Sequence, residues 1–141
     1  MIDIFEHSKV FVPINISGTH WVLAVINITE HTINYYDSLG SDGSRYLEVL
    51  LRYIQAEHIR KKQQPLQENE WALHSHDGSE IPQQDNNCDC GVFTLVYADY
   101  ITDNLPLTFE QKDIADFRLK IYHSIQSGKL WYSEQLVHTI E

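Results

Sequence analysis

The chain has 141 residues, of which 43% are hydrophobic and 21% are charged, so its composition is that of one ordered domain and not of a disordered chain. The 20 acidic residues against 10 basic ones give a net charge of −10, which disfavours binding to nucleic acid or to anionic membranes. The sequence holds no apolar run of about 18 residues, so it predicts no transmembrane helix.

The cysteine content indicates the redox environment in which the protein works. The only two cysteines, Cys88 and Cys90, are separated by one residue, and a disulfide across one residue is strained. The first residues are acidic and lack a signal-peptide pattern. We therefore expect a reducing intracellular compartment, which is the nucleus or cytoplasm, or a host cytosol if the protein is a pathogen effector.

Three strands are predicted in the first 40 residues. Val10–Ile16 is β-branched and apolar, and its Pro13 indicates an edge strand or a strand end. His20–Ile28 is almost continuously apolar, which is typical of a strand buried on both faces. A short connection, Thr29–His31, joins it to a third strand at Thr32–Ser38, so these two should be antiparallel neighbours.

A helix is predicted next. Ser44 is a suitable N-cap, leucines and isoleucine follow at helical spacing to about Lys62, and Pro65 stops the helix. Glu70–His74 is predicted to be a short strand, and His76–Asp89 a polar loop.

The last part of the chain predicts two more helices, Cys90–Asp103 and Phe109–Ser127, with Gly128 as the C-terminal cap. Leu130–Glu141 has no decisive pattern. The apolar stripe of the last helix consists of Ile114, Phe117, Ile121 and Ile125. With strands early and helices late, the fold class is α+β, a small, mostly antiparallel sheet packed against helices.

Cys90 is the candidate nucleophile. It ends a polar loop and opens an apolar helix, whose first N–H groups and dipole favour a thiolate. His20 and Asp37 lie at the edges of predicted strands, and Gln84 precedes the thiol by six residues. These residue types supply the nucleophile, base, orienting acid and oxyanion donor of a cysteine protease.

Each residue also has a structural interpretation. Free cysteines are usually small buried hydrophobes, and Cys88 keeps that interpretation. A lone histidine is more often structural, and Asp37 could simply begin a turn. Gln83 competes with Gln84 as the oxyanion donor, and the six-residue offset from the thiol favours Gln84.

A zinc site is the other chemistry that the sequence allows. It would combine His74 and His76 with Cys88 and Cys90, but the Cys-x-Cys spacing is not that of ordinary zinc sites. We therefore expect no metal and no cofactor.

Four motifs occur in one order along the chain: His20-Trp21, Asp37-Ser38, Pro82-Gln83-Gln84 with Asn86, and Asp89-Cys90-Gly91. They resemble the motifs of the ubiquitin-like-protein proteases, the family of the SUMO-processing cysteine peptidases and adenovirus proteinase. The resemblance runs from about Val10 to Gln126 and includes a late Phe117-Arg118 pair. It implies a papain-like cysteine protease core.

The resemblance also implies roles. Cys90 resembles the nucleophile, His20 the general base, Asp37 the residue that orients His20, and Gln84 the oxyanion donor. Trp21 resembles the tryptophan that lines a narrow tunnel for the glycine tail of the substrate, and the Gly91 position suits close approach of a substrate backbone.

The expected function is that of a monomeric isopeptidase or endopeptidase that cleaves after the Gly-Gly terminus of a ubiquitin-like modifier such as SUMO. The chain departs from the family because its catalytic histidine comes only 20 residues in. We therefore expect residues 1–141 to be a single catalytic domain in which the family's N-terminal segment is largely absent.

Two rival functions remain. An acetyltransferase of the same clan would use His, acid and Cys for acyl transfer, although the Pro-Gln-Gln form favours the protease branch. A truncated, non-catalytic module that binds a modifier would fit the short N-terminus, although the complete triad argues against it.

Overall fold

The structure is a computed structural model, and it describes residues 2–67 and 70–130. None of the helices in these two ranges is both long enough and apolar enough to cross a membrane. The elements, in chain order, are the 3₁₀ helix η1 (Ile4–Glu6), β1 (Lys9–Ile16), β2 (His20–Asn27), β3 (Thr32–Tyr36), α1 (Ser44–Lys62), β4 (Ala72–Ser75), α2 (Cys90–Thr102), the 3₁₀ helix η3 (Gln111–Asp113) and α3 (Ile114–Ser127).

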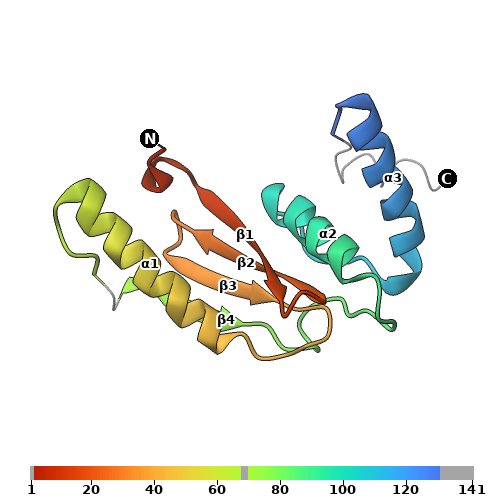
Figure 1. The fold of residues 1–141 in the computed structure, drawn as a ribbon, viewed down its shortest axis with the longest axis horizontal. Coiled ribbons are helices and arrows are strands. Elements are labelled where there is room, and N and C mark those ends of the chain that lie inside the picture. The colour runs from red at the N-terminus through yellow and green to blue at the C-terminus, as the bar shows by residue number, and fades with distance from the viewer. Residues whose placement is uncertain (1, 68–69, 131–141) are drawn as a thin grey trace.

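The four strands form one sheet in the order β1-β2-β3-β4. The pairs β1–β2 and β2–β3 are antiparallel, whereas β3–β4 is parallel. The predicted α+β class, the antiparallel pairing of the second and third strands and the edge position of Pro13 are all confirmed. Helix α1 covers one face of the sheet, and α2 covers the other, with α3 beyond it (Figure 1).

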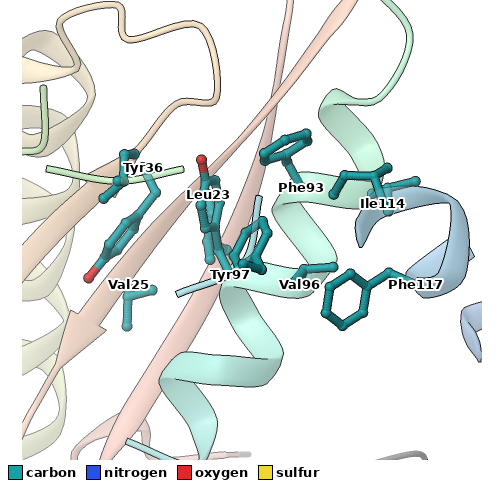
Figure 2. Close-up of a cluster of buried hydrophobic side chains, with 11 residues drawn as sticks. Leu23, Val25, Tyr36, Phe93, Val96, Tyr97, Ile114 and Phe117 are labelled. Atoms are coloured by element: carbon teal, nitrogen blue, oxygen red, sulfur yellow. The ribbon is translucent and has the colours of Figure 1, made fainter. Parts of the chain in front are cut away.

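Strand β2 joins two hydrophobic cores, because successive side chains of a strand point to opposite faces. Val22 and Ile26 pack in the cluster under α1, and Leu23 and Val25 pack in the cluster under α2. Each is at most 2% exposed, so the predicted burial of β2 on both faces is confirmed. Figure 2 shows the cluster under α2, which includes Leu23 and Val25 of β2, Phe93 and Tyr97 of α2, and Phe117 of α3.

Several predicted boundaries are wrong by small amounts. The third strand ends at Tyr36 instead of Ser38, and the fourth strand is Ala72–Ser75 instead of Glu70–His74. The N-cap of α1 is Gly43 instead of Ser44, and only glycine fits there, because an added Cβ would lie 2.1 Å from Cγ of buried Tyr35.

The predicted last helix is interrupted at its start. Phe109 is a buried core residue that lies before the helix and not in it. The 3₁₀ helix η3 follows, and α3 begins directly after it, at Ile114. Gly128 caps α3 with φ +67°, as predicted, but Ile125 is 79% exposed, so the predicted stripe is buried only at its beginning. Of the segment Leu130–Glu141, for which no pattern was predicted, residues 131–141 lie outside the described residues.

An ion pair fastens α3 to the start of α2. Arg118 donates to Asp89, which is the residue before Cys90. Gln111 of η3 donates to the other carboxylate oxygen of Asp89 at 2.9 Å, and Asn86 donates to that same oxygen at 2.7 Å. These hydrogen bonds, with Asn86 first in effect, hold the pKa of Asp89 below its ordinary value, against the opposing effect of burial.

The depressed pKa predicts an acid-sensitive contribution to stability. A carboxyl group whose pKa is lower in the folded chain stabilises the fold above its unfolded pKa and loses that effect as the pH falls through the folded value. Arg118→Ala removes one of the interactions that lower the pKa of Asp89. Its urea midpoint, followed from about pH 7 down to pH 2, should therefore fall by less than that of the unaltered protein, and the fall should end at a higher pH.

Arg52→Ala is the matched control, because Arg52 is an exposed arginine on α1, away from Asp89. The pH dependence of its urea midpoint should follow that of the unaltered protein. If the curves of midpoint against pH coincide for the two variants, Arg118 does not act on the ionisation of Asp89.

Candidate active site

The register between β2 and β3 brings His20 and Asp37 together. Leu23 is paired with Tyr36, so His20, three residues before Leu23, and Asp37, directly after Tyr36, lie at the same end of the sheet. The His20 Nε2–H group donates to Asp37 Oδ1 at 2.6 Å. Two of the predicted site residues are therefore in direct contact.

The carboxyl group of Asp37 is held in one orientation. Oδ1 also accepts the backbone N–H of Leu39 at 2.8 Å, and the Asp37 carbonyl closes a turn by accepting the N–H of Gly40, whose φ is +70°. Asp37 is 0% exposed, and its second oxygen, Oδ2, has no hydrogen-bond partner among the described residues. Because Nε2 of His20 is engaged with Oδ1, the lone pair of Nδ1 is left for another proton donor.

Cys90 is the first residue of α2 and is 7% exposed. In the first turn of a helix the N–H groups have no intrahelical partner, so they can point at a negative charge. Trp21 follows His20 in β2, and its Cδ1 would lie 3.7 Å from a Cβ placed on Gly91. The start of β2 and the start of α2 are therefore adjacent.

The structure does not make every predicted contact. No hydrogen bond joins the described residues Cys90 and His20; such bonds in unliganded sites are often long and tighten only when substrate binds. Trp21 is 43% exposed, so its role in substrate binding stays a prediction. Cys88 is exposed, and its thiol points to Asn86 Oδ1 at 3.5 Å, so it lies outside this arrangement and is not the buried residue that was expected.

The two glutamines are bound differently. Nε2 of Gln83 donates to the carbonyl oxygens of Asp37 at 3.1 Å, Pro82 at 3.2 Å and Ile81 at 3.4 Å, so its amide N–H groups are consumed by the backbone. Nε2 of Gln84 has one acceptor among the residues that the structure describes, the carbonyl of Asn86. An amide nitrogen carries two hydrogens, so Gln84 keeps one N–H for a further acceptor.

Ser38 orients the amide of Gln84. Its hydroxyl donates to Gln84 Oε1 at 2.5 Å, and its carbonyl accepts the backbone N–H of Gln84 at 2.9 Å. The amide is thereby fixed with its oxygen toward Ser38 and its nitrogen pointing away. Sequence reasoning missed this role, and the only signal was that Ser38 follows Asp37 directly in a family motif.

Tyr97 of α2 holds the same segment from its other side. Its hydroxyl donates to the carbonyl of Pro82, and burial, with a smaller effect from Asp37, raises the pKa of Tyr97, so that the phenol stays protonated. Asp85 N–H donates to Gln111 Oε1 at 3.1 Å. The segment before Cys90 is therefore fixed to the turn after β3, to α2 and to η3 at once.

Asn86 shapes the turn that leads into Cys90. Its side-chain oxygen accepts the N–H groups of Cys88 at 3.0 Å and Asp89 at 3.1 Å. The roles of Asn86, Gln111 and Arg118 were missed as well. The motif contained Asn86 and Arg118, but nothing local in the sequence shows that both contact Asp89.

The histidines of the zinc alternative do not gather with the cysteines. Within the described ranges, the donor atoms that come within 4.8 Å of one another belong to His74, His76 and Glu80. Burial, followed by the nearby His74, lowers the pKa of His76. Among the described residues this group does not include Cys88 or Cys90.

Comparisons with known proteins agree with the geometry. Residues 1–128 match the model of the Ulp1 protease family, C-terminal catalytic domain. Human sentrin-specific protease 2 is 42% identical over 129 residues, which is 92% of this chain but 22% of that protein. The ubiquitin-like-specific protease ESD4 of Arabidopsis thaliana is 38% identical over 117 residues, which is 83% of this chain and 23% of that protein.

Solved structures show the same fold. The C-terminal protease domain of Ulp1, solved in complex with Smt3, the yeast ortholog of SUMO, matches with a TM-score of 0.75 and 30% identity. The match covers 89% of this chain and 55% of that one, so the chain spans about half of that domain and about a fifth of the curated relatives. The chain belongs to the Ulp1 protease family and corresponds to part of its C-terminal catalytic domain.

Proposed function

We propose that the protein is a cysteine protease that cleaves after the C-terminal Gly-Gly of a SUMO-type ubiquitin-like modifier, in precursors or in isopeptide conjugates. One observation carries the proposal. The bond from His20 Nε2 to Asp37 leaves Nδ1 as the proton-accepting atom, in a Ulp1-family chain whose Cys90 opens α2.

The proposed reaction follows from these groups. His20 Nδ1 takes the thiol proton of Cys90, and the sulfur attacks the carbonyl carbon of the last glycine. The resulting oxyanion is stabilised by the N–H of Cys90 and the uncommitted N–H of Gln84. His20 then protonates the leaving amine. In the second half of the reaction water gives a proton to His20 Nδ1 and attacks the thioester carbonyl, and the sulfur of Cys90 leaves and is available again. Asp37 keeps the imidazole in the required tautomer throughout.

Specificity is assigned to Trp21 and Gly91. The indole lies beside a residue without a side chain, so an extended glycine tail can pass close to the backbone there. The named activities of the relatives, sentrin-specific and ubiquitin-like-specific protease, support a modifier as the substrate. The net charge of −10 favours a modifier with a basic face, and a free catalytic thiol suits a reducing compartment, the nucleus or the cytoplasm.

The proposal predicts covalent capture of the thiol. Modifier proteins that end in a glycine vinyl sulfone should label the protein once, at Cys90, and a panel of different modifiers identifies the substrate. Cys90→Ser should abolish both labelling and turnover with no loss of thermal stability, because the change is nearly isosteric and serine is a far weaker nucleophile at this site. Peptide mass spectrometry locates the adduct.

Cys88→Ser is the matched control, because Cys88 is exposed and two residues from Cys90. Its turnover should stay within a few fold of the unaltered protein. Equal losses in the two variants would contradict a single nucleophile at Cys90. Tight modifier binding without any labelling would indicate the non-catalytic binding module instead, and transfer of acetyl groups from a thioester donor would indicate the acetyltransferase.

The oxyanion assignment predicts a change in kcat. Gln84→Ala should lower kcat by roughly 10²-fold, because a side-chain donor of this kind acts mainly in the transition state. KM should change little. Alkylation of Cys90 by iodoacetamide should continue at its usual rate, because that reaction forms no tetrahedral oxyanion.

Two variants separate orientation from structure. Ser38→Ala frees the amide of Gln84 to rotate and should lower kcat less than Gln84→Ala does. Gln83→Ala removes donors to backbone carbonyls, so it should lower the melting temperature and leave kcat nearly unchanged. A large kcat loss in Gln83→Ala with a silent Gln84→Ala would show that the donor is Gln83.

A further inference from the structure

Two imidazoles and one carboxyl group converge at the outer edge of the sheet. His74 lies in β4, His76 follows the strand, and Glu80 lies in the next turn. One donor atom from each residue lies within 4.8 Å of the other two. We propose that His74, His76 and Glu80 form a binding site for a divalent transition metal of the zinc class, separate from the residues proposed for catalysis.

Strand geometry places the two histidines on one side. Residues two apart in an extended chain point to the same face, and His76 N–H donates to the Tyr35 carbonyl at 3.1 Å, which continues the ladder beyond β4. The two imidazole centroids are 4.2 Å apart, with an interplanar angle of 75°. Edge-to-plane rings of this kind can direct their nitrogens to a common point.

His76 is held with one nitrogen free to bind. Its Nε2–H donates to Asn34 Oδ1 at 3.2 Å, and Asn34 in turn donates to Thr32 Oγ1 at 3.0 Å. The ring also stacks on Tyr36 with centroids 4.5 Å apart. This is the outer-shell arrangement of metal-binding histidines, in which a hydrogen bond at one nitrogen fixes the tautomer and leaves the other as a ligand. Nδ1 of His76 then faces Glu80 Oε2 at 3.6 Å.

Glu80 is also oriented by its neighbours. The backbone N–H of Asp77 donates to Oε2 at 2.8 Å, and the N–H of Glu80 donates back to the Asp77 carbonyl at 3.1 Å. Ser79 fixes the Asp77 side chain within the same turn. The carboxyl group is thus aimed at the histidines by the local backbone.

The spacing from Glu80 to each histidine is close to that in a tetrahedral site, and the donor atoms of the two histidines lie within 4.8 Å of one another. Metal–ligand bonds of about 2.0–2.1 Å at tetrahedral angles put the ligand atoms about 3.3 Å apart. His74 Nε2 lies 3.1 and 3.2 Å from the two oxygens of Glu80, and His76 Nδ1 lies 3.6 Å from the nearer one. Two imidazole nitrogens and one carboxylate oxygen suit Zn²⁺, Co²⁺ or Ni²⁺, with a fourth position left for water.

A bound ion would join the edge strand to the segment that carries the glutamines. Glu80 precedes Gln84 by four residues, and that segment is otherwise held by β3 and α2. The ion would therefore stabilise the folded chain, by an amount that grows with the ratio of its free concentration to Kd.

Calorimetric titration with Zn²⁺ tests the site. The protein carries Cys88→Ser and Cys90→Ser, so that no thiolate competes for the metal. We expect one ion per chain. His74→Ala and Glu80→Gln should each weaken binding by at least about 10-fold, and Asn34→Ala, which removes only the outer hydrogen bond, by about 10–100-fold. His123→Ala, on the distant α3, should bind as the parent does.

Co²⁺ gives an independent readout, because its visible absorption reports tetrahedral coordination. Glu80→Gln is nearly isosteric, so its loss of binding cannot be assigned to unfolding, and circular dichroism checks the other variants. The proposal is overturned if the parent binds no Zn²⁺ in the micromolar range. It is equally overturned if His74→Ala and Glu80→Gln bind as tightly as His123→Ala, which would leave only an ordinary His–Glu ion pair at this edge.

Discussion

The register between β2 and β3 is the constraint on which the rest of the structure depends. With Leu23 opposite Tyr36, both side chains enter the core under α2, while Val22 and Tyr35 enter the core under α1. A slip of one residue would send each apolar side chain of β2 to the other face. The same slip would separate His20 from Asp37, so the packing of both cores protects the geometry of the site.

The dipeptide Asp37-Ser38 connects the two halves of the proposed chemistry. The side chain of Asp37 holds His20, and the side chain of Ser38 holds the amide of Gln84. The Asp37 carbonyl also accepts Gln83, so the base and the oxyanion donor share one backbone support. A disturbance at the end of β3 would therefore reach proton transfer and charge stabilisation together, although the two groups come from distant parts of the sequence.

The sequence predicts those features that depend on local patterns. Strand β2 is recognisable from its apolar run, and α1 is recognisable from the helical spacing of its apolar residues. Both patterns lie within a short stretch of sequence, so they can be seen without the structure. The parallel direction of β4 is not predictable in this way, since it follows from how α1 returns the chain to the sheet. Phe109 was misassigned to a helix because an apolar residue satisfies a helical pattern and a core anchor equally well.

Contacts between distant residues account for the other gaps. Ser38 and Gln84 are 46 residues apart, and Asp89 and Arg118 are 29 apart, so neither pair leaves a periodic signal. The motifs point to His20, Asp37, Gln84 and Cys90, and the structure places the first two in contact, while their catalytic roles stay predictions. Only the folded chain shows how tightly the surrounding hydrogen bonds fix the glutamine amide.

The buried Oδ2 of Asp37, which has no hydrogen-bond partner among the described residues, has an energetic consequence. A buried acceptor without a hydrogen bond costs about 1–3 kcal/mol, and Asp37 is 0% exposed. The other oxygen, Oδ1, offsets part of this cost, because it accepts from His20 and from the N–H of Leu39. The fold therefore gives up some local stability to keep a charged group beside the imidazole.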